Sequence, residues 1–60
     1  MRRYNYRTRC GGYLYVQREN RNYQDDYFVA GAKHLGKFKS AEEAQAALDE
    51  YAKSRGLDLA

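Results

Sequence analysis

Proline and tryptophan are absent from this sequence of 60 residues, and cysteine, methionine and histidine each occur once. The single Cys10 cannot form an internal disulfide, which favours a reducing compartment. No apolar run approaches the roughly 18 residues that a membrane span needs, and no apolar segment follows the arginine-rich start as it would in a secretory signal. We therefore expect a cytoplasmic protein, or a nuclear one in a eukaryote, with no membrane partner.

The short chain leaves room for only a small core. We expect residues 1–60 to form a single small domain, and such a chain buries only about 60% of its unfolded surface. The strong apolar core candidates are Leu14, Val16, Phe28, Val29, Leu35, Phe38, Leu48 and Leu57. So few side chains cannot wall a deep substrate cavity, and the tyrosines must supply much of the remaining apolar area.

Catalytic and metal-binding patterns are missing as well. The chain has one cysteine, Cys10, as a candidate nucleophile and one histidine, His34, as a candidate base. No third catalytic residue accompanies them at a recognisable spacing. A metal site needs three or four ligands, and one cysteine with one histidine falls short of that number. We therefore expect no enzyme, no cofactor and no metal, with Cys10 at the edge of the core and His34 at the surface.

Charge and tyrosine are distributed unevenly along the chain. The first eighteen residues contain five arginines and no acid, whereas the last twenty-one contain five acids against two bases. Six of the seven tyrosines precede that acidic segment. Guanidinium groups pair with phosphate oxygens and aromatic rings pack on sugars or bases, although the same two residue types also dominate protein–protein hot spots. The pattern indicates a binding surface.

The front of the chain predicts two strands. Residues 2–10 alternate with a period of two, which places Tyr4 and Tyr6 on one face and Arg7 and Arg9 on the other. Gly11–Gly12 is a hairpin turn signal, and residues 13–19 are rich in residues that favour strands. If Leu14 and Val16 face the core, the tyrosines at positions 13 and 15 join the arginines on the open face.

The middle of the chain is harder to interpret. Residues 19–26 are polar and read as a loop or as the tip of a long hairpin. Residues 27–35 predict a third strand whose register is left open, with Gly31 as a possible bulge that switches faces midway.

A helix of about residues 41–55 is the clearest prediction. Ser40 and Glu43 have the spacing of a capping box, and Ala44, Ala47, Leu48, Tyr51 and Ala52 form one apolar stripe. Gly56 is placed to end the helix in a left-handed conformation, with Leu57 as its hydrophobic partner. The expected fold class is α+β, with a three-stranded antiparallel sheet packed on one C-terminal helix in the order βββα.

The arginine-rich sheet face leads to a functional hypothesis. Arginine occurs six times before residue 22 and lysine not at all, a choice that bidentate contact with phosphate or guanine favours and that solubility alone does not require. We expect a small nucleic-acid-binding module that contacts duplex DNA with Arg3, Arg7, Arg9, Tyr13, Tyr15 and Arg18. A sheet is narrow enough to enter the major groove, and the acidic helix would be held away from phosphate.

Two other partners remain open. The same face would serve as a hot-spot patch in a small phage-type inhibitor or adaptor that binds a host protein. RNA is the other alternative, because exposed tyrosines on a sheet can stack single-stranded bases.

The segment LGKFKSAEEAQAALDEYA, residues 35–52, resembles the end of the ethylene-response-factor DNA-binding domain of plant transcription factors. Related domains occur in phage homing endonucleases and as the arm-binding domain of phage integrases. The resemblance implies three strands and a helix, with the sheet bound in the DNA major groove. The tryptophans of that family have no counterpart here, so Tyr13 or Tyr15 would replace them. Arg7, Arg9 and Arg18 fall where the family places arginines that contact DNA.

Overall fold

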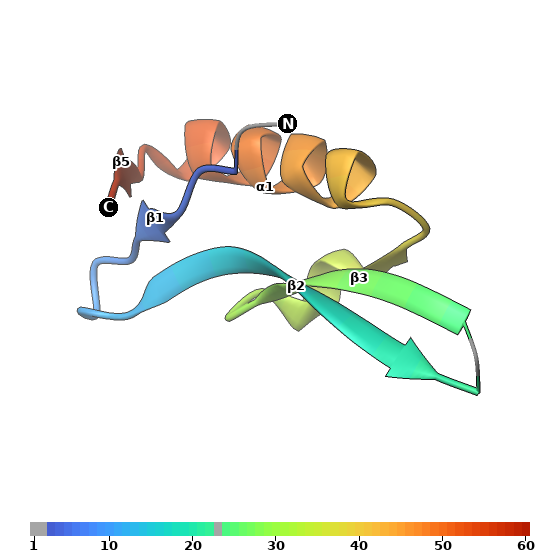
Figure 1. The fold of residues 1–60 in the computed structure, drawn as a ribbon. Helices are drawn as coiled ribbons and strands as arrows, with labels where there is room; N and C mark the ends of the chain where they lie inside the picture. Colours follow the sequence, from blue (N-terminus) through green and yellow to red (C-terminus); the bar gives the residue numbers. More distant parts are fainter. Residues whose placement is uncertain (1–2, 23) are drawn as a thin grey trace.

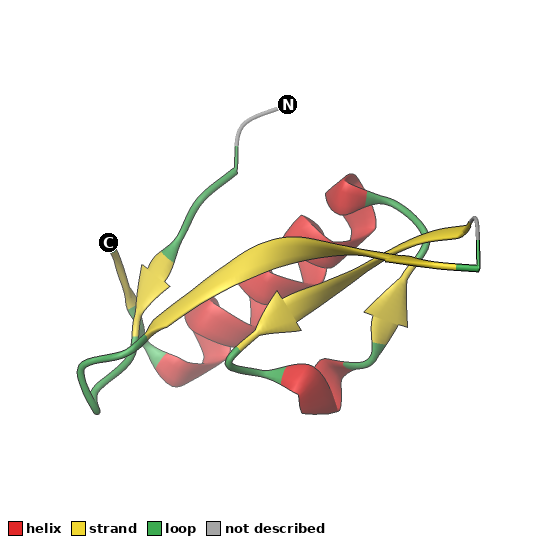
Figure 2. Cartoon of the chain, turned by 60° about the horizontal axis from the view of Figure 1, so that its bottom comes forward, coloured by secondary structure: helices red, strands yellow, loops and turns green. Residues whose placement is uncertain are grey.

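One antiparallel sheet with a single long helix across one of its faces makes up the described part of the chain (Figure 1). The computed structural model describes residues 3–22 and 24–60. Its elements are β1 (Tyr6–Arg7), β2 (Tyr13–Arg21), β3 (Gln24–Ala30), the 3₁₀-helix η1 (Lys33–Leu35), β4 (Lys37–Phe38), α1 (Ala41–Arg55) and β5 (Asp58–Leu59). The strand order is β4-β3-β2-β1-β5. Figure 2 shows the uncovered face of the sheet in front, with α1 behind it.

The predicted α+β class, with an antiparallel sheet and one C-terminal α-helix, is confirmed. The predicted number of strands is wrong, since the sheet has five strands. The two additional strands, β4 and β5, are each two residues long and lie at the two edges of the sheet. Such short segments carry too few side chains to show an alternating pattern.

The first strand is much shorter than the predicted range of 2–10, of which residue 2 lies outside the described residues. A tight turn starts at Thr8: its N–H donates to the Gly12 carbonyl at 2.9 Å, and its hydroxyl accepts from the Gly12 N–H at 2.8 Å. Arg9 and Cys10 therefore belong to the turn, and Cys10 is exposed instead of lying at the edge of the core. Tyr4, expected to face inward, precedes β1 and is also exposed.

The segment predicted as a loop, residues 19–26, forms most of the end of the β2–β3 hairpin. The two strands pair from Tyr15 and Ala30 as far as Arg21 and Gln24. The Asn20 side chain supports this register by donating to Asp25 Oδ1 at 2.8 Å. Figure 1 shows the hairpin extending past the end of α1. Both of its faces are wet there, so polar residues occupy strand positions and no alternation marks them.

The third strand ends five residues earlier than its predicted limit at residue 35. Gly31 is not a bulge but the start of a turn, with φ at 91° and the Ala32 N–H donating to the Val29 carbonyl at 3.1 Å. A Cβ at position 31 would lie 2.6 Å from Leu14 Cδ2, so both the backbone angle and the space require glycine. The chain then forms η1 and reaches the sheet edge as β4.

The helix runs from Ala41 to Arg55, as the sequence predicts. The Ser40 hydroxyl accepts from the Glu43 N–H at 3.1 Å, which completes the predicted N-cap. At the other end Gly56 is left-handed with φ at 67°, and the Leu57 N–H donates to the Ala52 carbonyl at 2.9 Å. This pairing is typical of a Schellman ending, and it directs the chain into β5.

The core lies between α1 and the sheet. Its buried members are Leu14, Val16, Val29, Ala32, Ala44 and Leu48. Three further predicted core residues, Leu35, Phe38 and Leu57, are half-buried against this cluster. Phe28, also predicted for the core, lies elsewhere, because Val29 points toward α1 and the next residue along a strand points the other way. Within the described residues, no helix is long and apolar enough to cross a membrane.

Candidate nucleic-acid-binding surface

The candidate binding surface is the face of the sheet turned away from α1, which we call the open face. On β2, Leu14 and Val16 are buried under the helix, so Tyr13 and Tyr15 point to the open face, as the sequence predicts. Their exposed fractions are 57% and 41%. These are high values for aromatic side chains in the middle of a domain, and they make the two rings available for contact with a partner.

A third aromatic ring continues this row on the neighbouring strand. Phe28 of β3 is paired with Gln17 of β2, and directly opposite residues in an antiparallel pair share one face. Tyr13, Tyr15 and the Phe28–Gln17 pair therefore occupy three successive open-face positions along the sheet. We call these three rings the aromatic row. Phe28 is half-buried, because lysine side chains lie over and beside its ring.

A hollow of about 580 Å³ lies at the Phe28 end of the aromatic row. Its lining includes Gln17, Phe28, Lys33 and Lys37. The Lys33 ammonium lies 5.7 Å from the centre of the Phe28 ring, within the range of a cation–π contact. The Lys37 Nζ lies 3.4 Å from Glu19 Oε2. Arg18, Glu19 and Gly36 complete the lining, so the hollow combines one aromatic ring with three basic residues and one acid, which is paired with Lys37.

Sequence reasoning did not select Phe28, Lys33 or Lys37 as site residues. Phe28 resembled a core residue, and the register of its strand was undetermined. The signal that would have placed it is the pairing of Arg21 with Gln24. Counting back along both strands from that pair brings Gln17 opposite Phe28. The positions of Lys33 and Lys37 depend on the path of the chain around Gly31 and Gly36. Local sequence patterns do not reveal that path.

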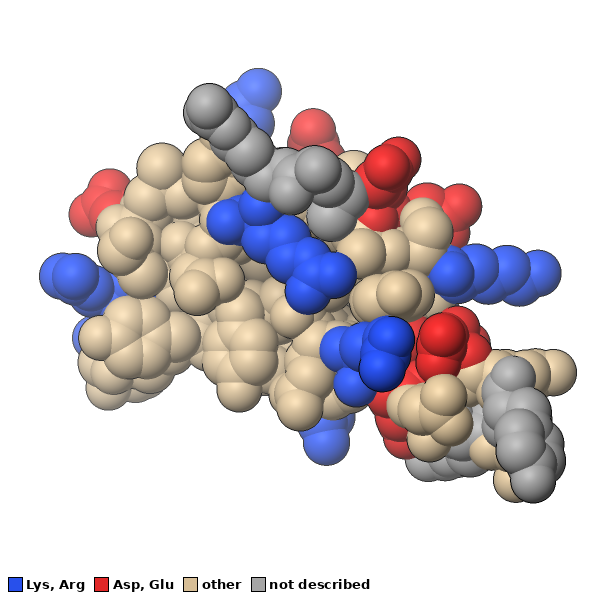
Figure 3. Space-filling model, in the orientation of Figure 1, with Lys and Arg blue, Asp and Glu red and all other residues tan. Residues whose placement is uncertain are grey.

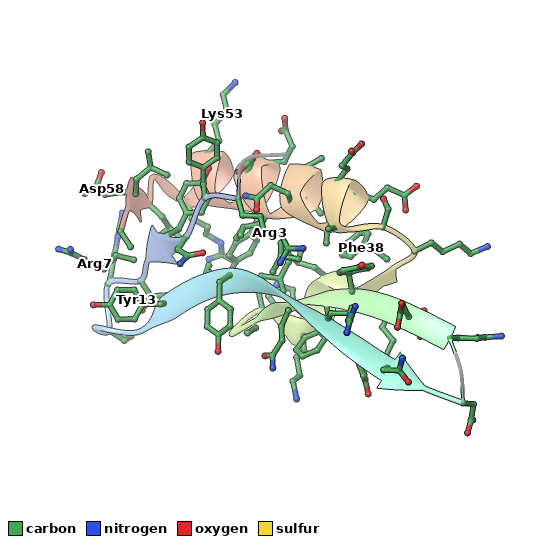
Figure 4. All side chains as sticks on the ribbon, viewed as in Figure 1. Arg3, Arg7, Tyr13, Phe38, Lys53 and Asp58 are labelled. Atoms are coloured by element: carbon green, nitrogen blue, oxygen red, sulfur yellow. The ribbon has the colours of Figure 1, made fainter. Side chains whose placement is uncertain are left out.

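The predicted arginines do not gather on the open face. Arg7 does lie there, since it is paired with Tyr13, but its other neighbour in the sheet is Asp58 of β5. Arg9 is exposed in the turn after β1, and Arg3 is exposed in the segment before it. Figure 4 shows Arg3 at the middle of the molecule and Arg7 at one end beside Asp58.

Arg18 lies on the other side of the sheet from the tyrosines. It shares the parity of Leu14 and Val16, and its partner on β3 is Tyr27, which packs against the core. Strand parity thus directs the Arg18 side chain to the helix side and not to the open face, although Arg18 also lines the hollow beside Gln17 and Phe28. The Arg18 side chain is exposed.

Basic and acidic side chains are only partly separated onto opposite sides of the sheet. Figure 3 shows basic side chains in the middle of the face in view, with acidic side chains along α1 and at the end of the β2–β3 hairpin. The predicted acidic helix is therefore present on the far side of the sheet. The hairpin end is acidic too, since Glu19 and Asp26 face each other there. On the open face, Arg7, Lys33 and Lys37 lie near the aromatic row, and the Glu19–Asp26 pair lies beyond it.

A polar cluster on the other side of β1 fixes which side chains face outward. The Tyr6 hydroxyl donates to Asp49 Oδ1 of α1 at 2.6 Å. Gln45 Nε2 donates to the same oxygen at 2.9 Å and to the Tyr4 carbonyl at 3.2 Å. The hydrogen bond to Asp49, with some desolvation by burial, raises the pKa of Tyr6 to about 12. Because Tyr6 points inward to α1, the next residue, Arg7, points outward.

Cys10 and His34 lie in separate surroundings. Cys10 is in the exposed turn after β1, whereas the His34 ring packs edge-on against Tyr51 at 5.3 Å between centroids. Among the described residues, no group of three or more His, Cys, Asp or Glu side chains is placed to hold a metal ion.

Comparison with known protein families, with curated proteins and with solved structures finds no match to this chain.

Proposed function

We propose that this protein is a small nucleic-acid-binding module whose open face is the contact surface. The observation that carries the proposal is the exposure of Tyr13 and Tyr15 side by side on that face, with Arg7 paired to one of them. A surface without a binding role gains nothing from two large rings in water, since their burial would stabilise the fold. Exposed sheet aromatics bordered by basic side chains suit bases and phosphates.

Duplex DNA is the ligand that the sequence favours, and the resemblance of residues 35–52 to the ethylene-response-factor domain supports it. The arginines differ in how they could contact duplex DNA. Arg7 is on the open face, whereas Arg9 and Arg3 flank β1 and Arg18 is on the helix side. A duplex laid on the open face would therefore contact Arg7, Lys33 and Lys37 before it reached the other arginines.

Titration by fluorescence anisotropy tests the proposal, using a labelled mixed-sequence duplex and a labelled single strand at several salt concentrations. We expect binding at low salt, with log K falling by about 0.7 to 0.9 per released phosphate contact for each tenfold rise in salt. Lys33→Ala should weaken binding. Lys53→Ala is the matched control, because Figure 4 shows Lys53 on the side of α1 turned away from the sheet. Absence of binding to both ligands at low salt would overturn the proposal.

A protein partner is the second candidate, and the outer edge of β2 favours it. β1 pairs with β2 only at Tyr13 and Leu14, and within the described residues no strand covers that edge from Val16 onward. Figure 2 shows the chain before β1 turning away from β2. An extended segment of another protein can add to such an edge through main-chain hydrogen bonds. A pull-down from host lysate that retains one protein equally with and without nuclease would favour this candidate.

A further inference from the structure

From the layout of the open face we infer that the preferred nucleic acid is single-stranded, with about three unstacked bases on Tyr13, Tyr15 and Phe28. This inference rests on the proposed function and deepens it by naming the ligand class. It depends on three features of the described residues: the spacing of the aromatic row, the hollow at Phe28 and the acidic pair beyond that end of the row.

The spacing of the aromatic row suits bases that are not stacked on one another. Tyr13, Tyr15 and the Phe28–Gln17 pair are each two residues apart along β2, and a strand rises about 3.3 Å per residue. Tyr13 and Tyr15 are therefore about 6.6 Å apart, and Phe28, diagonal to Tyr15 across the strand pair, is about 7–8 Å from it. Both steps are roughly twice the 3.4 Å per nucleotide of a duplex strand. A flexible single strand can spread its bases to this step, whereas a duplex keeps them stacked and hides their faces from aromatic side chains.

The hollow at Phe28 provides the subsite for the last of these bases. The Phe28 ring carries the Lys33 ammonium over one face, so a base that stacks on this ring brings its phosphate close to Lys33. Lys37 also lines the hollow, where it pairs with Glu19. The Gln17 side chain lines the hollow as well and carries both a donor and an acceptor for the edge of a base. A volume of about 580 Å³ is within the range of small-molecule sites, so a base fits without rearrangement of the backbone.

An acidic pair limits the length of the site at one end. Beyond the Phe28 end, the next open-face pair is Glu19 with Asp26. Lys37 pairs with Glu19, while the Asp26 carboxylate repels phosphate. At the other end the row stops at Tyr13, the first residue of β2. Three aromatic positions between this strand end and the acidic pair match a site of about three nucleotides. A duplex would extend past the acidic pair and bring its phosphates against it.

Oligonucleotides of stated length and type test this inference. The probes are oligodeoxythymidine and oligouridine of two to eight nucleotides and a hairpin duplex, each titrated into the full chain with amide chemical shifts as the readout. We expect the affinity to rise steeply up to about three nucleotides and only slightly beyond, and the single strands to bind more tightly than the duplex. The two single strands separate DNA from RNA as the source of the shared base-and-phosphate chemistry.

The variant Phe28→Leu removes the aromatic ring and keeps an apolar side chain. It should weaken single-strand binding by about tenfold, the scale of one lost base-stacking contact. Phe38→Leu is the matched control, because Phe38 lies beside it on β4 but packs against the core, and Figure 4 shows it between α1 and the sheet. It should leave the affinity of the folded protein unchanged. If Phe28→Leu does not fold, Tyr15→Leu replaces it with the same expected loss.

The outcomes separate this inference from the proposed function. Duplex binding as tight as single-strand binding would overturn the inference and leave the proposed function standing. The same holds if single-strand affinity is unaffected by Phe28→Leu and Tyr15→Leu in folded protein. Absence of binding to every probe would overturn both.

Discussion

The side chains on the two faces of β2 have different surroundings. On the face turned to α1, the surroundings also change from one end of the strand to the other. Leu14 and Val16 are buried under α1, while Arg18, on the same side, is exposed. On the open face Tyr13 and Tyr15 are exposed throughout. Alternation therefore decides the side of the sheet, and coverage by α1 decides burial. Changes on the covered helix side should affect stability, and changes on the open face should affect binding.

Leu48→Ala should have the largest effect on stability. Leu48 is fully buried between α1 and the sheet, and the loss of such a side chain costs about 2–5 kcal/mol. A small domain has a total stability of about 5 kcal/mol, so most of the variant should be unfolded at 25 °C in a chemical denaturation experiment. Leu59→Ala is the control, because Leu59 is 57% exposed and its loss should shift the curve little. Equal effects of the two changes would contradict the assignment of the core.

Gly31→Ala should cause the next largest loss of stability. Comparison with Gly36→Ala shows how much of that loss is steric. The two glycines have nearly the same φ, 91° and 93°, so each alanine incurs a backbone strain of about 1–3 kcal/mol. At Gly31 the new Cβ also meets Leu14 Cδ2 at 2.6 Å, whereas at Gly36 nothing lies within 4 Å. Thermal melts should therefore show the larger loss for Gly31→Ala. Equal losses would mean that Leu14 moves aside without cost.

Tyr6→Phe should cost about 1 kcal/mol, because it removes the hydrogen bond to Asp49 but keeps the ring. The pKa of Tyr6 is about 12 in the folded state against 10.0 for an ordinary tyrosine. The stabilisation is therefore complete below pH 10 and is lost as the pH rises from about 10 to 12. The stability difference between the original chain and Tyr6→Phe should shrink over that range. Tyr13→Phe is the control, because the Tyr13 ring is exposed on the open face and the change should leave stability nearly unaltered.

Arg7→Ala should have the smallest effect on stability. Arg7 is exposed on the open face, and substitutions there usually stay within about 0.5 kcal/mol of neutral. Its melting curve should nearly coincide with that of the original chain, while anisotropy titrations should show weaker nucleic-acid binding. A loss of stability as large as that of Tyr6→Phe would show that β1 presents its other face to α1, and the open-face site would have to be redrawn.

The helix and the sides of β2 were predictable because their signals are local. Ser40, Glu43 and Gly56 mark the ends of α1 within one turn of each end, and the apolar stripe between them has the helical period. The alternation around Leu14 and Val16 likewise needs only the strand itself. These signals depend on neighbouring residues, so the sequence alone carries them.

The candidate site was predictable only in part, because its members depend on pairing between strands. Tyr13, Tyr15 and Arg7 follow from parity, and the structure places them on the open face. Phe28 was assigned to the core, because an apolar residue in a short run gives no indication of its face until the register is known.

The sequence by itself determined the helix, its caps, the α+β class and the sides to which Tyr13, Leu14, Tyr15 and Val16 turn, since all of these rest on contacts within a few residues. Tertiary structure alone decided where β1 ends and that Phe28, Lys33 and Lys37 meet at one hollow. Those features depend on strand register and on the path of the chain between strands, which are set when distant segments pack together.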